Sequence, residues 1–184
     1  ESGKDRTYQC TIQMNYYDKS GAWTATVGIA DLGGLTAQSS STFTINLLRD
    51  ISINPTIINF PSVAYGDANT TSANATGIIN NGNFDSASGS ILITAFDLVG
   101  ETNSSEKIPA ASFKVADLSA QATVCNSGNT LTNSAQVAVP NAVLPRGPSG
   151  SNTGGLVYCL ASIPDISSQY YSAIGGNSWI ISIN

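Results

Sequence analysis

The stretch that decides the fold class runs from residue 8 to residue 16 and reads YQCTIQMNY. Large apolar side chains occupy every second position, and polar Gln, Thr and Asn side chains stand between them. A period of two is typical of a strand with one buried face. The apolar face of this predicted strand consists of Tyr8, Cys10, Ile12, Met14 and Tyr16.

The alternation continues to residue 47. The turn sequence DKSG at 18–21 precedes a second predicted strand over 23–29, and DLGG at 31–34 ends it. A third strand is predicted over 41–47. Three strands leave an apolar face and unpaired edges, which are a hazard in water. We therefore expect a second domain, an upstream segment or a strand of a neighbouring subunit to cover that face.

Short strand patterns separated by turn residues recur through the rest of the chain. Residues 90–99 are apolar on both faces and predict a central buried strand. Pro55 indicates an edge strand or a bend within 51–60, because proline donates no ladder hydrogen bond. Residues 145–155 predict an exposed loop. The other predicted strands are 74–80, 110–116, 121–125, 135–139, 156–160 and 178–183.

This spacing predicts an all-β fold, an antiparallel immunoglobulin-like Greek-key sandwich. We expect a partial three-strand unit over 1–48 and a larger sandwich domain over 49–184. Residues 166–171 are read either as a short helical turn or as an irregular loop. The predicted core of the larger domain is Ile53, Ile58, Phe60, Ile79, Ile91, Ile93, Phe96, Phe113, Val115, Val137, Val139, Leu156, Tyr158, Trp179 and Ile181.

The composition excludes several classes of function. Charged residues make up 10% of the chain, whereas Ser, Thr and Asn number 25, 17 and 17. There is no His, which excludes a Ser-His-Asp triad and a His-ligated metal. Seven cations within a net charge of −5 argue against nucleic acid. No apolar run reaches the roughly 18 residues that a membrane-spanning segment needs. We expect a non-enzymatic protein without a cofactor.

Location and processing follow from the same features. The low charge and the high Ser, Thr and Asn content favour a secreted protein of the cell surface. The chain begins at Glu1 with neither Met nor an apolar signal region. We therefore expect a processed product or a piece of a longer chain.

Three cysteines are present. Cys125 and Cys159 lie in the same predicted domain, each beside a predicted strand, and an extracellular setting would oxidise them. We predict that they form a structural disulfide. Cys10 is left over, either as a buried free thiol or as the partner of a cysteine upstream or in another chain.

No group of residues predicts catalysis. Glu101 and Glu106 are the closest pair of Glu residues, and nothing marks them as the paired acids of a glycosidase. The loop at 80–85 lacks the acid density of a calcium site, so no metal site is predicted. Asn69, Asn74 and Asn103 each begin an N-x-S/T sequon and are candidate glycosylation sites.

Residues 17–31 read YDKSGAWTATVGIAD and resemble the second half of PKD-like or immunoglobulin-like repeats of prokaryotic surface proteins. Such repeats carry a Y-x-x-x-G-x-W/Y-T-x-T-V-x-V-x-D pattern followed by a closing strand. The stretches INPTIINF at 53–60 and IINNGNFD at 78–85 resemble secreted archaeal sandwich proteins and β-sandwich subunits of extracellular filaments. The resemblance implies a structural role at the cell surface and assigns no functional residues.

Three functions remain open, of which the third is an enzyme or an enzyme's accessory domain. The first is a subunit of an extracellular filament, pilus or surface layer, assembled head to tail with copies of itself by β-strand addition. Residues 8–16 are the expected assembly strand, with the polar residues 1–6 as a tether. The second is a monomeric adhesin or glycan-binding module of the cell surface. Exposed aromatic side chains beside Asn or Asp in one loop cluster would favour it.

Overall fold

The computed structural model describes residues 8–173 and 177–184 and has an all-β fold in which every strand pair is antiparallel. The strands are β1 (Gly21–Ala30), β2 (Thr36–Ile45), β3 (Ile51–Asn54), β4 (Ala68–Thr71), β5 (Thr76–Asn80), β6 (Ile91–Thr94), β7 (Leu98–Gly100), β8 (Lys107–Ile108), β9 (Phe113–Asp117), β10 (Asn129–Thr130), β11 (Val137–Ala138), β12 (Thr153–Ser162), β13 (Tyr171–Ser172) and β14 (Ile180–Ile183). The helical segments are η1 (Ala110–Ser112), η2 (Leu118–Thr123) and α1 (Val124–Ser127). No helix among the described residues is long and apolar enough to cross a membrane.

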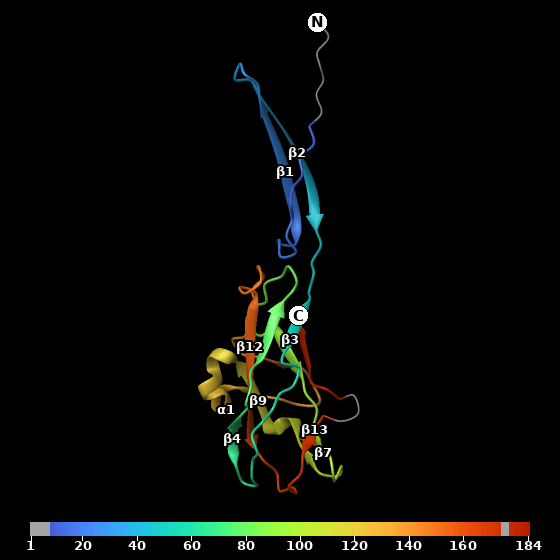
Figure 1. Cartoon of the computed structure of the whole chain (residues 1–184), viewed down its shortest axis with the longest axis vertical. Helices are drawn as coiled ribbons and strands as arrows, with labels where there is room; N and C mark the ends of the chain where they lie inside the picture. Colours follow the sequence, from blue (N-terminus) through green and yellow to red (C-terminus); the bar gives the residue numbers. More distant parts are fainter. Residues whose placement is uncertain (1–7, 174–176) are drawn as a thin grey trace.

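β1 and β2 form a hairpin that projects from the rest of the chain (Figure 1). The two strands pair along their full length, from Gly21–Ile45 to Ala30–Thr36. Asp31 closes the turn, because its carboxylate accepts hydrogen bonds from the backbone N–H groups of Gly33 and Leu35, both at 2.8 Å. We call residues 8–48 the arm and residues 49–184 the body.

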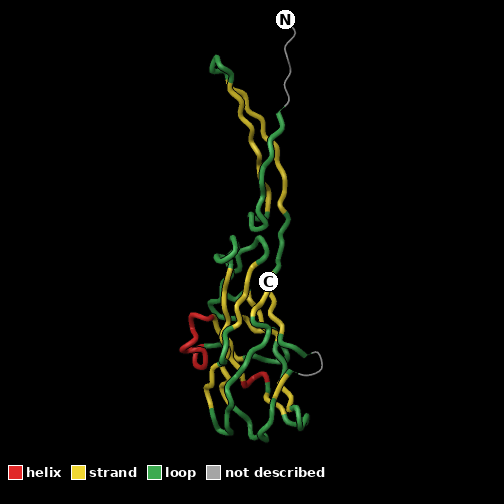
Figure 2. The backbone as a smooth tube through the Cα atoms, viewed as in Figure 1, coloured by secondary structure: helices red, strands yellow, loops and turns green. Residues whose placement is uncertain are grey.

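The body is a sandwich of two layers (Figures 1 and 2). The first layer has the strand order β10-β9-β12-β5-β3, and β4 pairs with the end of β12. The second layer has the order β11-β6-β14. A further three-stranded sheet, β13-β7-β8, follows it, because residues 95–97 alone separate β6 from β7.

A single main core fills the space between the layers. Phe113 and Tyr158 of the first layer pack against Trp179, with ring centroids 5.1 and 5.9 Å apart. The sequence correctly predicted seven fully buried members of this core: Ile91, Ile93, Phe113, Val115, Val139, Leu156 and Tyr158. Six further predicted members are partly buried against it: Ile53, Ile58, Phe60, Val137, Trp179 and Ile181.

Two predicted core residues lie outside that core. In β5 the fully buried isoleucine is Ile78, and Ile79 is half-buried on the other face. Shifting a strand by one position exchanges its two faces. Nothing in the local sequence IIN indicates whether Ile78 or Ile79 faces the core. Phe96 lies in the break between β6 and β7, so the single strand predicted over 90–99 is in fact two.

The prediction of a strand over 121–125 was wrong. These residues belong to η2 and α1, which cover the outer face of the first layer and place Val124 in a second small core with Ala116, Val157 and Cys159. Figure 2 shows this helical segment on one side of the body. Five residues are too few to separate a period of two from a helical turn. Residues 166–171, for their part, contain no helix.

The arm also differs from its prediction. Residues 8–15 are not in a strand, so the described part of 1–48 contains two strands where three were expected. A strand exists only when a neighbour completes its hydrogen-bond ladder, and within the described residues of one chain this segment has no such neighbour. β2 begins at Thr36, whereas the predicted strand began at residue 41. Its polar residues 36–40 continue the backbone hydrogen-bond ladder with β1.

Candidate assembly surface

Exposed apolar side chains are concentrated on the arm. Of the 18 large hydrophobic side chains exposed among the described residues, 12 lie between residues 8 and 48. Only three charged residues, Asp18, Lys19 and Asp31, occur in the same span. Large apolar patches on soluble proteins mark interaction surfaces. The arm is therefore the strongest candidate for a functional surface.

The hairpin has one apolar face and one polar face. Trp23 pairs with Phe43 across the two strands, and their rings stack with centroids 6.5 Å apart. Val27 and Ile29 extend this face toward the turn, whereas Thr24, Thr26 and Thr42 lie on the other face. An isolated two-stranded hairpin is marginally stable in water, and partners normally cover such a face.

The predicted assembly residues lie along the arm. Tyr8, Ile12, Met14 and Tyr16 are all exposed, with 70% and 58% of Tyr8 and Ile12 accessible to solvent. Cys10 is exposed and forms no disulfide within the described chain, so it is not the buried thiol that was one of its expected states. The Tyr16 hydroxyl donates a hydrogen bond to the carbonyl oxygen of Gly147 at 3.2 Å, which ties one end of this segment to the body.

A buried asparagine holds the base of the arm. The Asn83 side chain accepts from the backbone N–H of Leu48 at 2.7 Å and donates to the carbonyl oxygen of Asn46 at 2.9 Å. At Gly82 an added Cβ would overlap the carbonyl oxygen of Leu48, so glycine is required for the close approach of the linker. The sequence predicted only a loop at 80–85 and missed this role.

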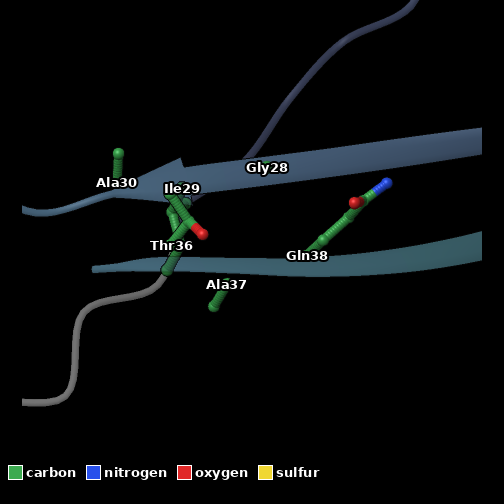
Figure 3. Close-up of a pocket in the computed structure, with 6 residues that line it drawn as sticks. All are labelled: Gly28, Ile29, Ala30, Thr36, Ala37 and Gln38. Atoms are coloured by element: carbon green, nitrogen blue, oxygen red, sulfur yellow. The ribbon is translucent and has the colours of Figure 1, made fainter. Parts of the chain in front are cut away.

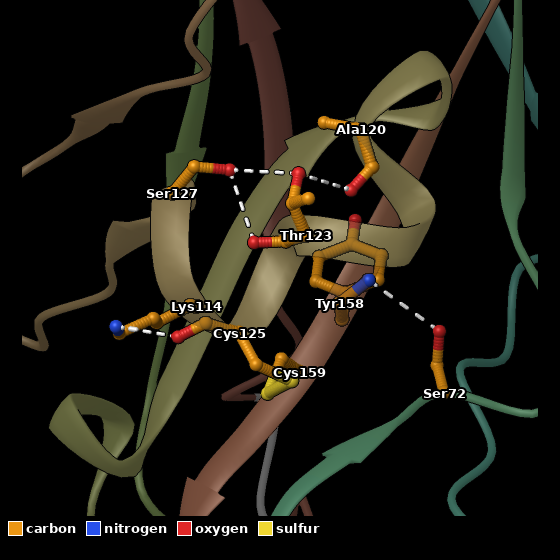
Figure 4. The surroundings of a disulfide bond; sticks show 8 residues. All are labelled: Ser72, Lys114, Ala120, Thr123, Cys125, Ser127, Tyr158 and Cys159. Atoms are coloured by element: carbon orange, nitrogen blue, oxygen red, sulfur yellow. Dashed lines mark hydrogen bonds between the residues drawn. A yellow bond between two sulfur atoms is a disulfide. The ribbon is translucent and has the colours of Figure 1, made fainter.

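The predicted disulfide between Cys125 and Cys159 is confirmed (Figure 4). It joins α1 to β12, and its Cα atoms are 5.2 Å apart, within the usual range. Lys114 donates a hydrogen bond from Nζ to the carbonyl oxygen of Cys125 at 2.7 Å. The disulfide holds η2 and α1 against the outer face of the first layer.

Loss of this disulfide should lower the free energy of unfolding substantially. The cross-link spans 34 residues, and closing a loop of that size restricts the unfolded chain by roughly 3–4 kcal/mol. We expect the double variant Cys125→Ala/Cys159→Ala to lose about that amount in denaturant titrations. Cys10→Ser is the matched control and should unfold like the parent. A double variant as stable as the parent would show that the bond does not form.

A second polar cluster joins the β7–β8 loop to residues 167–171. The Glu106 carboxylate accepts hydrogen bonds from both the backbone and the hydroxyl of Ser167, from Gln169 at 2.7 Å and from Tyr171 at 2.9 Å. The Ser167 hydroxyl is the largest cause, and together these donors lower the pKa of Glu106 to about 2. Gln169 also accepts from the backbone N–H groups of Thr102 and Asn103.

The lowered pKa of Glu106 predicts a pH-dependent contribution to stability. The carboxylate is favoured in the folded state, so its stabilisation is complete above the ordinary pKa of 4.5 and is lost as the pH falls toward about 2. We expect Glu106→Gln to lower the melting temperature above pH 5, and the difference from the parent to close near pH 2. Glu101→Gln on the same loop is the control. A difference in melting temperature between Glu106→Gln and the parent that does not change with pH would contradict the lowered pKa of Glu106.

The three sequons lie in different environments. The Asn74 side chain accepts from the backbone N–H of Asn59 and donates one amide hydrogen to the carbonyl oxygen of Ile57, so a glycan that preserves this contact must replace the other amide hydrogen. Asn103 is exposed, and its side-chain oxygen accepts from both the backbone and the hydroxyl of Ser105. Asn69 is exposed on β4 with a positive φ of 58°. Asn103 and Asn69 are therefore compatible with a glycan in the folded state.

Two surface depressions lie among the described residues. One lies on the arm near the hairpin turn and is lined by uncharged residues of β1 and β2, among them Ile29, Thr36 and Gln38 (Figure 3). The second lies between the arm and the body and contains Tyr17, Trp23 and Arg146. The described residues contain no cluster of three or more His, Cys, Asp or Glu side chains that could hold a metal ion.

No family model, curated protein or solved structure matches the chain.

Proposed function

We propose that the protein is a non-enzymatic structural subunit of an extracellular filament, pilus or surface layer, and that it assembles head to tail by β-strand addition. In this proposal the arm of one copy completes the immunoglobulin-like Greek-key sandwich of the next. The Cys125–Cys159 disulfide and the accessible Asn103 sequon are compatible with an oxidising location outside the cell.

The observation that carries this proposal is the exposure of the arm. Tyr8, Ile12, Met14 and Tyr16 repeat every second or fourth residue, and all four are exposed in one copy of the chain. Burying an apolar side chain of this size contributes about 1.5–3 kcal/mol before ordering costs. A donated strand would obtain its affinity from main-chain hydrogen bonds and its specificity from alternate side chains that fill pockets.

The direction of the arm also supports a polymer. The hairpin leaves the body at a base fixed by Asn83, and it projects away from the core of its own chain (Figure 1). A surface on one part of a molecule that binds a different surface on the next copy gives a contact that does not close on itself. Such contacts propagate as a fibre.

Electron microscopy and light scattering of the purified full chain test this proposal directly. We expect filaments of uniform width at moderate protein concentration, and species larger than the 19.0 kDa monomer by light scattering. A protein that stays monomeric at every concentration and forms no filaments would contradict it.

The second candidate function is a glycan-binding adhesin, and one observation favours it. Tyr17 and Trp23 line the depression between the arm and the body together with Asp18 and Arg146. Aromatic rings beside polar side chains can stack on sugar rings while hydrogen bonds orient the hydroxyl groups. Trp23 fluorescence during titration with oligosaccharides distinguishes the two functions, since a saturable change in the monomer would support the adhesin.

A further inference from the structure

The two layers of the body contain different numbers of strands. The continuous path of the first layer has five strands, whereas the second layer has the three strands β11, β6 and β14. One edge of the sandwich is closed: Asn129 in β10 donates a side-chain hydrogen bond to the carbonyl oxygen of Ala138 in β11 at 2.8 Å. The layers are therefore aligned at this edge, and the mismatch falls at the other one.

When the strands of the two layers are matched in order from the closed edge, β10 lies opposite β11, β9 opposite β6 and β12 opposite β14. The Trp179 ring, immediately before β14, packs against both β9 and β12, with centroids 5.1 Å from Phe113 and 5.9 Å from Tyr158, which agrees with this position. β5 and β3 extend beyond β14. Ile58, Phe60 and Val63 of the segment 58–63 also pack against the core, and the Phe60 ring lies 5.4 Å from that of Phe113 in β9. No strand of the described chain lies beside β14 on its outer side.

The core is incompletely covered along this open edge. Ile51 and Ile53 of β3 contact the core from the first layer, and Ile181 and Ile183 of β14 contact it from the second. All four side chains are half-buried, in contrast to the fully buried Ile91 and Ile93 of the central strand β6. The open edge thus combines unpaired backbone groups with partly exposed core side chains.

The two strands of the open edge carry no charged or proline side chain that would oppose pairing with other chains. Exposed edge strands usually carry Lys, Pro, bulges or inward charges. β14 reads IISI and has none of these, and Ile180 is 52% exposed. β3 is likewise uncharged. Residues 8–16 contain no charge either, so no repulsion opposes their contact with this edge.

From this juxtaposition we infer that β14 and β3 form the acceptor site for residues 8–16 of a second copy of this chain. The inference rests on the proposed function and locates the receiving surface that the function requires. The donated segment hydrogen-bonds to the free edge of β14 and adds a fourth strand to the second layer. Its alternating side chains Tyr8, Cys10, Ile12, Met14 and Tyr16 point inward and cover Ile51 and Ile53, and the Tyr16 hydroxyl gives up its hydrogen bond to Gly147 on transfer.

Strand geometry fits this arrangement. The donated strand lies about 4.8 Å from β14, and side chains on the same face of directly paired residues have Cβ atoms about 4.5–5.5 Å apart. Ile181 and Ile183 share the inward face of β14, because both contact the core. Cys10 lies on the inward face of the donor. A cysteine at either position in β14 therefore comes within disulfide distance of Cys10 in one of the possible registers.

Oxidative cross-linking of the full chain tests the acceptor site. Ile181→Cys and Ile183→Cys are made separately, and each is also combined with Cys10→Ser. We expect at least one of the single variants to give a ladder of disulfide-linked oligomers on non-reducing gels, and the combined variants to give none. Leu118→Cys is the matched control, because it is an exposed residue on η2, on the outer side of the sandwich. It should give no ladder.

The outcomes distinguish the acceptor site from the proposed function. Filaments without a ladder from either β14 variant, or with an equal ladder from Leu118→Cys, would overturn the acceptor site and leave the proposed function standing. An absence of both filaments and ladder would overturn both. Hydrogen exchange of the unsubstituted protein tests the acceptor site even if the cysteine variants misfold. We expect the amides of 180–183 to exchange at least about tenfold more slowly in the polymer than in a monomer lacking residues 1–17. Equal rates would overturn the acceptor site.

Discussion

Deletion of residues 1–17 should abolish filament formation and leave the body folded. The removed segment supplies the five alternating apolar side chains of the proposed donor strand, each of which contributes about 1.5–3 kcal/mol when buried. None of the fully buried core side chains belongs to residues 8–17, so the body retains its core. Microscopy and light scattering measure the loss of polymer, and circular dichroism measures the remaining fold. Filaments that persist after the deletion would contradict strand donation by this segment.

A pair of variants separates the role of the apolar face from the mere presence of the segment. Ile12→Ser/Met14→Ser removes two side chains of the alternating face, whereas Thr11→Ser/Gln13→Ser changes two positions on the opposite face of the same segment. We expect the first pair to weaken assembly by more than tenfold, because each lost burial of about 1.5–3 kcal/mol corresponds to at least that factor. The second pair should assemble like the parent. Equal effects would indicate that side-chain alternation does not determine assembly.

The sequence predicted the class of the fold well because the strands of the body carry their own signals. The patterns at 74–80 and 156–160 overlap β5 and β12, and seven of the predicted core residues are fully buried. β4, β8, β10 and β13 were not predicted. They are two to four residues long, and β4 reads ANTT, so they lack enough apolar side chains for a period to be visible.

The contacts that fix the arm and the loops were beyond prediction for a different reason. Asn83 lies 35 residues from Leu48 in sequence, and Glu106 lies 61 residues from Ser167. Asn and Glu in turns are ordinarily explained by local hydrogen bonds, so neither residue type signals a distant partner. The disulfide was predictable because the number of cysteines is small and the bond needs only two members. Each polar cluster forms only when three or four residues come together in the folded chain.

The largest stability loss from a single core substitution is expected for Phe113→Ala. Phe113 is 1% exposed, and its ring packs against those of Phe60 and Trp179 with centroids 5.4 and 5.1 Å away. It therefore connects β9 with the segment 58–63 and with the residue that precedes β14. Removing a buried aromatic ring costs about 3–5 kcal/mol, since the cavity closes only in part. Phe43→Ala is the matched control: its ring is 37% exposed on the arm, and its loss should change the unfolding of the monomeric body by less than about 0.5 kcal/mol. Denaturant titration of both variants in the background lacking residues 1–17 keeps assembly out of the measurement. Equal losses would mean that arm and body unfold as a single unit, whereas the expected difference would show that the body holds its core independently of the arm that it donates.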